Sequence, residues 1–197
     1  MIRYFVQLEY DGTNYFGFQK QKHTRNTIQN KINKALASIA NHKVKTVCAG
    51  RTDSGVHALN QIIHFDTNSK RTINSWIKGT NTYLPGDIAV KGFYKVDKNL
   101  HARFDASSRT YKYFIKQCSE KIAIERNNCL WVKEKLNVEL MNKACNYLLG
   151  EKDFSSFRAS RCQSASAIRT VHQAFFRQKG KYLVFEISAN AFLLNLS

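Results

Sequence analysis

The stretch around which this chain is built reads Ala49-Gly50-Arg51-Thr52-Asp53-Ser54-Gly55-Val56-His57-Ala58. It connects two predicted strands, Val44–Cys48 and Leu59–Thr67, and its glycines permit backbone angles that a β-carbon forbids. A connection that only reverses the chain commonly uses Asn-Gly or Asp-Gly, whereas this loop is long and carries ionisable groups. Loops held by a rigid sheet are where reactive side chains gather. Two interpretations are therefore open: Asp53 is catalytic, or it caps a turn and pairs with Arg51.

The composition favours a polyanionic partner. The chain has 197 residues, of which 43% are hydrophobic, so it can form one large domain or two small ones with a buried core. Lysine and arginine number 31 against 14 acidic residues, a formal net charge of +17. Because the basic residues are spread along the chain, the folded surface must be positive, which favours nucleic acid. The alternative is general basicity without a specific partner.

The cysteines and histidines predict neither disulfides nor a metal site. The cysteine count is odd and no Cys-X-X-Cys occurs, so these residues are predicted to be small buried hydrophobes in a reducing compartment. They are Cys48, Cys118, Cys129, Cys145 and Cys162. The histidines lack metal-ligand spacing, and neither a signal peptide nor an apolar run of membrane-spanning length is present. We therefore expect a soluble, cytoplasmic protein that binds no metal and no membrane.

The hydrophobic pattern of the first half predicts the order β-α-β-β-α-β, the split βαβ or ferredoxin-like unit. Asn26 is the predicted N-cap of the first helix, with Gln29 placed for a capping box. In the second helix, Ile73, Trp76 and Ile77 are predicted to face inward. The predicted elements are Ile2–Tyr10, Ile28–Ala40, Val44–Cys48, Leu59–Thr67, Ile73–Tyr83 and Ile88–Val96.

The second half predicts a similar unit that stops early. Its helix is capped by Asn137, presents an apolar stripe and has Gly150 at its C-terminal cap position. Its predicted strands are Arg109–Gln117, Leu130–Val132, Thr170–Arg177 and Tyr182–Ala189, and its stripe is Val138, Met141, Ala144, Cys145 and Leu148. After Asn190 only about two turns of a further helix are possible.

The predicted fold class is accordingly α+β, with two ferredoxin-like β-α-β-β-α-β halves built on antiparallel sheets. The N-terminal half is expected to span residues 1–108 and to carry the Asp53 loop. The C-terminal half is expected to span residues 109–197 and to be truncated, because a last helix and strand do not fit before Ser197.

A second candidate site lies on the strand Arg109–Gln117. Alternation places Arg109, Tyr111, Tyr113 and Ile115 on one face. Tyr113 and Ile115 are predicted to be core residues, whereas Tyr111 beside a cation can stack on a nucleobase. A carboxylate repels phosphate, so an aspartate in a basic nucleic-acid site makes sense as a nucleophile or a general base.

Motifs along the whole chain resemble those of the TruA-type tRNA pseudouridine synthases. The loop Gly50–Ala58 is similar to the signature of that family. Further segments resemble the family in the family's order, although a tryptophan is usual where Phe18 stands: Tyr10-Asp11-Gly12-Thr13, Gly17-Phe18-Gln19, His101-Ala102-Arg103-Phe104, Arg109-Thr110-Tyr111-Lys112-Tyr113, Asp153-Phe154-Ser155-Ser156-Phe157-Arg158 and Ala189-Asn190-Ala191-Phe192-Leu193.

The resemblance implies an isomerase that converts uridine to pseudouridine in the anticodon stem-loop of tRNA. In that mechanism Asp53 initiates the reaction, Arg51 enters the helix stack and holds the displaced uridine out, and Tyr111 stacks against the uracil. Chemistry on a paired base requires its extrusion, which costs a few kcal/mol, so stacking and hydrogen bonds must compensate. The reaction needs no cofactor and no metal, and the family works as a homodimer that shares one tRNA. The candidates for contacting the RNA backbone are Lys20, Lys22, Arg25 and Arg109.

An alternative function follows from the expected truncation. Family members continue beyond Phe192-Leu193 with a helix whose arginine pairs with the catalytic carboxylate, and Ser197 comes before that arginine. The chain is then either an active tRNA pseudouridine synthase or a catalytically impaired, truncated homologue that only binds RNA. A DNA-binding regulator is disfavoured, because no helix-turn-helix or zinc-finger spacing occurs.

Overall fold

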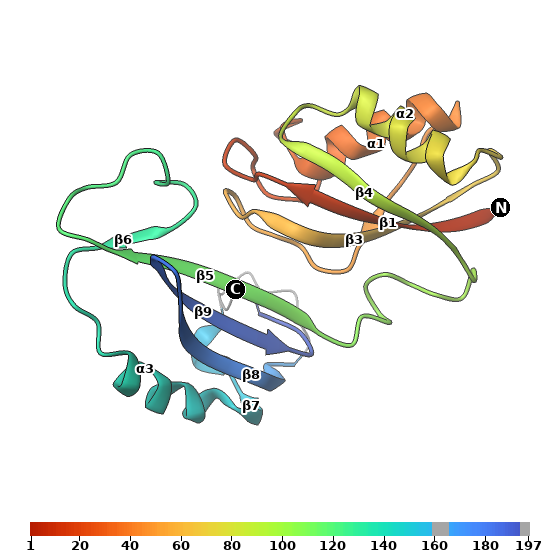
Figure 1. Ribbon diagram of the computed structural model, residues 1–197. Coiled ribbons are helices and arrows are strands. Elements are labelled where there is room, and N and C mark those ends of the chain that lie inside the picture. Colours follow the sequence, from red (N-terminus) through yellow and green to blue (C-terminus); the bar gives the residue numbers. More distant parts are fainter. Residues whose placement is uncertain (159–165, 194–197) are drawn as a thin grey trace. The chain divides into compact units, whose positions relative to one another are not determined.

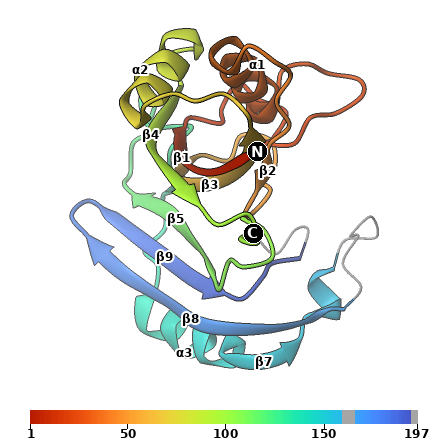
Figure 2. The ribbon, with the colours of Figure 1, turned by 90° about the vertical axis from the view of Figure 1, so that its right-hand side faces the viewer.

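The computed structural model describes residues 1–158 and 166–193, and the chain forms two compact units, Met1–Ala106 and Ser107–Ser197 (Figure 1, Figure 2). Each unit contains one sheet with helical segments beside it, and most strand pairs are antiparallel. The α+β fold class predicted from the sequence is therefore confirmed. No helix within the described residues is long and apolar enough to cross a membrane.

The first unit is a four-stranded antiparallel sheet with two helices on one face (Figure 1). The strand order is β2-β3-β1-β4, so the central pair is formed by the first and third strands. The elements are β1 (Ile2–Tyr10), α1 (Ile28–Ala40), β2 (Val47–Cys48), β3 (Ala58–Thr67), α2 (Ile73–Tyr83) and β4 (Ile88–Val96).

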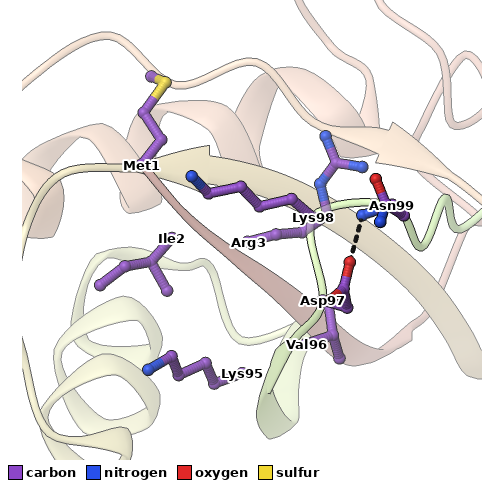
Figure 3. Close-up of a pocket in the computed structure, with 8 residues that line it drawn as sticks. All are labelled: Met1, Ile2, Arg3, Lys95, Val96, Asp97, Lys98 and Asn99. Atoms are coloured by element: carbon purple, nitrogen blue, oxygen red, sulfur yellow. Dashed lines mark hydrogen bonds between the residues drawn. The ribbon is translucent and has the colours of Figure 1, made fainter.

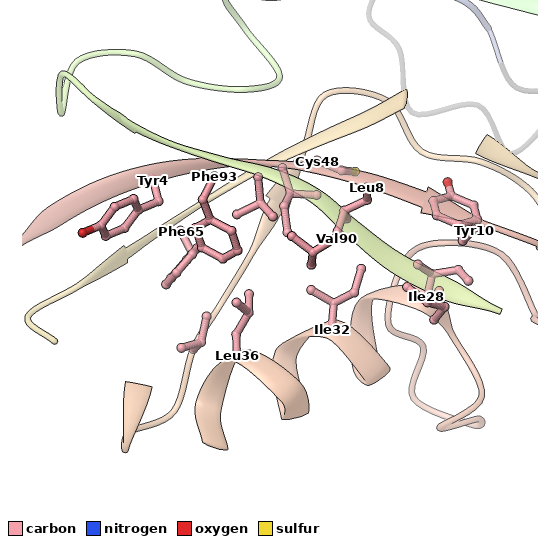
Figure 4. Packing of buried hydrophobic residues seen from close by; sticks show 14 of the residues in the cluster. Tyr4, Leu8, Tyr10, Ile28, Ile32, Leu36, Cys48, Phe65, Val90 and Phe93 are labelled. Atoms are coloured by element: carbon pink, nitrogen blue, oxygen red, sulfur yellow. The ribbon is translucent and has the colours of Figure 1, made fainter. Parts of the chain in front are cut away.

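The core of the first unit lies between the sheet and its helices (Figure 4). Strand β1 alternates as predicted, because its even-numbered residues from Tyr4 to Tyr10 are buried while the intervening ones are partly exposed. On α1 the residues that face this layer recur at helical spacing: Ile28, Ile32, Ala35, Leu36 and Ala40. Trp76 of α2 is fully buried, and its ring centroid lies 5.6 Å from that of Phe65 and 5.6 Å from that of Phe93. This packing holds the sheet of the first unit against its two helices.

Three local predictions for this unit are wrong. The N-cap of α1 is Thr27, whose side chain accepts a hydrogen bond from the Asn30 amide, whereas the Asn26 side chain donates to the Asn14 carbonyl at 2.6 Å. Gln29 forms no capping box, because its side-chain amide bonds to backbone atoms outside the helix. Ile73 does not face inward but remains 40% exposed in the first turn of α2.

Strand β2 is shorter than the predicted Val44–Cys48, and the reason lies at Thr46. The carbonyl oxygen of Thr46 accepts from Gln29 Nε2 at 2.8 Å, and its hydroxyl donates to Asn33 Oδ1 at 2.8 Å. The backbone is therefore bound to α1 at this point and joins β3 only at Val47.

The second unit contains a five-stranded sheet in the order β6-β5-β9-β8-β7. Among the strand pairs of the described residues in this unit, β5 and β6 alone are parallel, and α3 lies along one face of the sheet (Figure 1). The elements are β5 (Arg109–Gln117), β6 (Leu130–Val132), α3 (Val138–Cys145), the 3-10 turn η1 (Asn146–Leu148), β7 (Gly150–Asp153), the 3-10 turn η2 (Ser155–Phe157), β8 (Ile168–Lys179) and β9 (Tyr182–Ala189). The helix begins after Asn137 as predicted, because that side chain accepts from the Leu140 amide at 3.0 Å.

Several predictions for the second unit need correction. Gly150 has a φ of 86° after η1, but it also begins a strand that the sequence did not predict, β7. Tyr113 is not a core residue, since it is 55% exposed, whereas Ile115 is buried. Of the predicted helix stripe, Ala144 is exposed.

The cysteine prediction is correct only in part. Cys48 and Cys145 are buried, Cys118 and Cys129 are partly exposed, and Cys162 lies outside the described residues. None of the four described cysteines is in a disulfide bond. At the end of the chain, residues 191–193 are not helical, and the other positions of the helix expected there lie outside the described part.

Candidate active site

The loop between β2 and β3 is fastened at its first turn by the strand that follows it. The Ala49 amide donates to the Ile62 carbonyl at 2.8 Å. The Gln61 side chain then holds both backbone groups of Gly50, because Nε2 donates to the carbonyl at 2.6 Å and Oε1 lies 3.4 Å from the amide nitrogen. The loop therefore leaves the sheet in one defined direction.

The last residue of β1 supports the middle of the same loop. Tyr10 is 3% exposed, and its hydroxyl lies 2.8 Å from Thr52 Oγ1. Gln61 Nε2 lies 3.5 Å from the same hydroxyl. The Tyr10 phenol is protonated at neutral pH and can bond to Thr52, and burial raises its pKa further above neutrality. The bond with Tyr10 therefore fixes the loop at Thr52, the residue between Arg51 and Asp53.

Two glycines outside the loop allow the segment after β1 to approach it closely. A β-carbon on Gly12 would lie 2.0 Å from the Val56 carbonyl oxygen, which is a direct overlap. Gly17 has a φ of 79°, and a β-carbon there would lie 2.9 Å from the Thr52 carbonyl oxygen. Because neither glycine has a β-carbon, the two backbones come close enough for the Phe18 amide to donate to the Thr52 carbonyl at 2.9 Å. The loop is therefore clamped from both sides by backbone.

The carboxylate of Asp53 stands at the exposed tip of this clamped loop. Among residues 1–158 and 166–193 it has no hydrogen-bond or ion-pair partner. The turn there is closed by the Asp53 carbonyl, which accepts from the Val56 amide at 3.3 Å, and the next residue but one, Gly55, has a φ of 79°. The interpretation in which the carboxylate caps a turn and pairs with Arg51 is therefore wrong.

Near the end of the loop, His57 contacts Asp11 and Gly12 of the segment that follows β1. His57 Nδ1 lies 3.0 Å from Asp11 Oδ1 and 3.2 Å from the Gly12 amide nitrogen. Hydrogen bonding by Thr13 lowers the pKa of Asp11, and His57 adds to the effect. Asp11 is therefore ionised and committed to its neighbours, which leaves Asp53 as the carboxylate of this region that is available for chemistry.

The cationic candidates of the first unit lie on the segment between β1 and α1. Lys20, Lys22 and Arg25 are all exposed there. The Lys20 amide donates to Gln29 Oε1 at 2.9 Å, so the segment is tied to the first turn of α1. Arg51 is exposed on the neighbouring Asp53 loop.

The other two predicted site residues belong to the second unit. The ring of Tyr111 on β5 packs edge-on against that of Phe192, with centroids 4.8 Å apart and an interplanar angle of 80°. Arg109, at the start of β5, donates from Nη1 to the Asn190 carbonyl at 2.6 Å. The structure thus brings Arg51 and Asp53 together on one loop, and Tyr111 and Arg109 together on one strand.

Sequence reasoning missed the residues that hold the loop, namely Tyr10, Gly12, Gly17 and Gln61. The first three lie in the motifs Tyr10–Thr13 and Gly17–Gln19, so the resemblance of those segments to the family was the available signal. Gln61 gave no signal, since its role depends on the fold. Within the described residues, no group of three or more histidine, cysteine or acidic side chains is arranged to hold a metal ion.

Comparison with known proteins places this arrangement in a class of RNA-modifying enzymes. A model of the family described as tRNA pseudouridine synthase matches residues 7–105 and 144–195. The tRNA pseudouridine synthase A of Francisella philomiragia subsp. philomiragia is 45% identical over 193 residues, covering 98% of this chain and 74% of that protein. The proteins of the same name from Francisella tularensis subsp. mediasiatica and subsp. novicida match with the same identity and the same coverage. The chain belongs to the tRNA pseudouridine synthase family.

Proposed function

We propose that this chain is an isomerase that converts uridine to pseudouridine in the anticodon stem-loop of tRNA. The observation that carries the proposal is the unpartnered Asp53 carboxylate, presented on a loop clamped by backbone contacts, in a chain of this family. The relatives matched above bear the name tRNA pseudouridine synthase A, which supports tRNA as the substrate. A carboxylate left exposed on a chain of net charge +17 is otherwise unfavourable for RNA binding, because it repels phosphate.

In the proposed reaction Asp53 initiates breakage of the N1–C1′ glycosidic bond of the target uridine. The base turns, C5 bonds to C1′, and the proton lost from C5 is balanced by one gained at N1. Atoms and charge are conserved within the nucleotide, so the chemistry requires neither a redox cofactor nor a group donor.

The flipped uridine needs stabilising contacts, because extrusion from a stem costs a few kcal/mol. Arg51, next but one to Asp53, is proposed to occupy the vacated position in the helix stack. Tyr111 is proposed to stack against the uracil, and its edge-on contact with Phe192 supports a fixed ring orientation. Phosphate contacts are assigned to exposed or partly exposed cations: Lys20, Lys22, Arg25 and Arg109.

The fold is proposed to consist of two ferredoxin-like halves, residues 1–108 and 109–197. The element order β-α-β-β-α-β and the strand order β2-β3-β1-β4 support this assignment for the first half. We further propose a homodimer that shares one tRNA and a location in the cytoplasm. The described cysteines form no disulfide with one another, which is in keeping with a reducing compartment.

The test is formation of pseudouridine in an unmodified tRNA transcript, detected by carbodiimide labelling. The native chain is expected to yield product, and Asp53→Asn is expected to abolish product while tRNA binding persists. Glu139→Gln, the same carboxylate-to-amide change on exposed α3, serves as the matched control and should retain activity. Binding by the native chain without any product would instead support the RNA-binding alternative.

A further inference from the structure

The chain after β4 folds back onto the sheet of the first unit and is anchored there at two positions, Leu100 and Ala102. Arg3 is fixed by Asp66, with Nε and Nη2 donating to the two carboxylate oxygens at 2.8 Å each. Its remaining nitrogen, Nη1, donates to the Leu100 carbonyl at 2.8 Å. Two residues on, the Ala102 amide donates to Nδ1 of buried His64 at 3.1 Å. The segment Leu100–Asp105 is therefore held against the sheet by buried or partly buried partners.

Inside this segment, hydrogen bonds from backbone amides orient the His101 ring, and the Phe104 ring stacks on it. His101 Nδ1 accepts from the amides of Arg103 and Phe104 at 3.2 Å each. The His101 amide donates to Asp105 Oδ2 at 2.7 Å, which closes the turn. The rings of His101 and Phe104 stack with centroids 4.3 Å apart and an interplanar angle of 22°. The guanidinium carbon of Arg103 lies 5.8 Å from the centroid of the Phe104 ring.

Phe104 nevertheless remains 76% exposed. A single exposed apolar side chain is ordinary on a protein surface. Here, however, the ring is oriented by its neighbours and has a cation beside it, so its surface is both apolar and close to positive charge. Aromatic rings and arginine side by side are the two features on which unpaired nucleobases stack in single-strand RNA sites.

The same segment starts at a basic hollow of about 570 Å³ (Figure 3). Its cationic lining residues are Arg3, Lys95 and Lys98, and Arg3 is also the residue that anchors Leu100. The one acidic residue of this lining, Asp97, accepts a hydrogen bond at its carboxylate from the Asn99 backbone amide at 2.8 Å. The hollow thus offers positive charge for a phosphate backbone at the base of the segment that presents the rings.

We propose that His101, Phe104 and Arg103 form a stacking platform for an unpaired nucleobase of the tRNA. This inference rests on the proposed function for its substrate, but it concerns binding and not the chemistry at Asp53. His64 and Asp105 act as positioning residues, because they hold the backbone that orients the rings.

The test compares Phe104→Leu with the native chain in binding an unmodified tRNA transcript. Leucine keeps the apolar bulk and removes the ring, so tRNA affinity is expected to fall about 5- to 150-fold, the range for loss of one stacked base. Phe104→Trp should retain native affinity, because it keeps a stacking face. Tyr83→Leu, which removes a 60% exposed ring from the end of α2 in the same unit, is the matched control and should change nothing.

A blunt RNA duplex of the same length provides the second arm, since it has no unpaired base. Native chain and Phe104→Leu should bind it equally. Three results would overturn the platform. The first is that Phe104→Leu binds tRNA with native affinity, and the second is that it loses the same affinity for tRNA and for the duplex. The third is a loss of tRNA affinity that accompanies altered self-association in gel filtration. Product formation separates the two proposals: tRNA binding that depends on the Phe104 ring without any pseudouridine refutes the activity and leaves the platform intact.

Discussion

At the scale of single residues, the Asp53 loop is positioned by contacts that only glycine permits. Gly12 and Gly17 bring the chain after β1 so close that a β-carbon would overlap the backbone of the loop. Backbone atoms have no rotamers, so this contact fixes the loop more tightly than long side chains could. The backbone that carries the exposed Asp53 carboxylate is therefore fixed, although the carboxylate itself has no ion-pair partner among the described residues.

Gly12→Ala should consequently impair catalysis. The added methyl group would lie 2.0 Å from the Val56 carbonyl oxygen, so the loop must shift. Forced overpacking costs ~1–3 kcal/mol of stability, and a displacement of about 1 Å at a reacting group costs ~100-fold in rate. Gly86→Ala is the control, because a β-carbon there meets nothing within 4 Å. Pseudouridine yield together with the urea midpoint measures both effects, and equal rates for the two variants would contradict the clamp.

His64 makes the stability of the protein depend on pH. Burial, with smaller contributions from Arg3 and His101, lowers its pKa from 6.5 to about 4. The neutral ring accepts the Ala102 hydrogen bond, so the folded chain resists protonation where the unfolded chain does not. The contribution is complete above about pH 6.5 and is lost as the pH falls towards 4, to an extent of up to ~3 kcal/mol.

The measurement is urea unfolding at about pH 7.5 and about pH 5, with His64→Gln as the comparison. Acidic residues titrate in both proteins, so the difference between the two pH dependences isolates His64. The native chain should lose more stability on acidification than the variant. An identical loss in both would show that His64 is protonated in the folded state.

At the scale of elements, α2 depends on one side chain. Trp76 packs against Tyr4, Phe65 and Phe93 and is fully buried. Trp76→Ala is expected to destabilise the first unit by ~3–5 kcal/mol, since it removes a fully buried indole and leaves a cavity in the core. Trp131, in the second unit, is 36% exposed, so Trp131→Ala should cost only about 1 kcal/mol. Urea unfolding followed by circular dichroism compares the two, and similar midpoints would contradict the packing argument.

The elements also show how far sequence reasoning reaches. Helices α1 and α2 were predicted with their observed bounds, because apolar periodicity and polar caps are local signals. Strand β7 could not be predicted, since its four residues are all exposed and show no alternation. It exists because β8 extends to Ile168 and provides a pairing edge. The N-cap of α1 was misplaced by one residue, as Asn26 and Thr27 are both good caps and only the tertiary contact with Asn14 decides between them.

For the candidate site the limit is similar. Arg51 and Asp53 could be singled out from the loop itself, because ionisable groups between glycines at a strand end are a local pattern. Tyr10 and Gln61, which hold the loop, could not, since their contacts join positions distant in sequence. The catalytic and RNA-binding roles of the predicted residues stay predictions until product formation is measured.

At the scale of the whole molecule, charge governs encounter with RNA. A net charge of +17 on 197 residues attracts phosphate over about 8–10 Å at physiological ionic strength. Each phosphate neutralised releases counterions, so the logarithm of tRNA affinity should fall linearly with the logarithm of salt concentration. An affinity that does not change between low and physiological salt would contradict binding through the positive surface.

The slope of that line identifies which cations bind phosphate. Replacing Lys20, Lys22 and Arg25 by alanine should reduce the slope by about 0.7–0.9 for each phosphate that is no longer neutralised, hence by roughly 2–3 if all three participate. A matched triple variant at exposed positions of the second unit, Lys133, Lys135 and Lys152, removes the same charge. If only net charge mattered, both triple variants would bind tRNA more weakly but would neutralise the same number of phosphates. The slopes of log affinity against log salt concentration would then be the same for both variants. Because the Lys20–Arg25 segment is tied to α1 beside the Asp53 loop, we expect the slopes to differ, with the first variant the shallower.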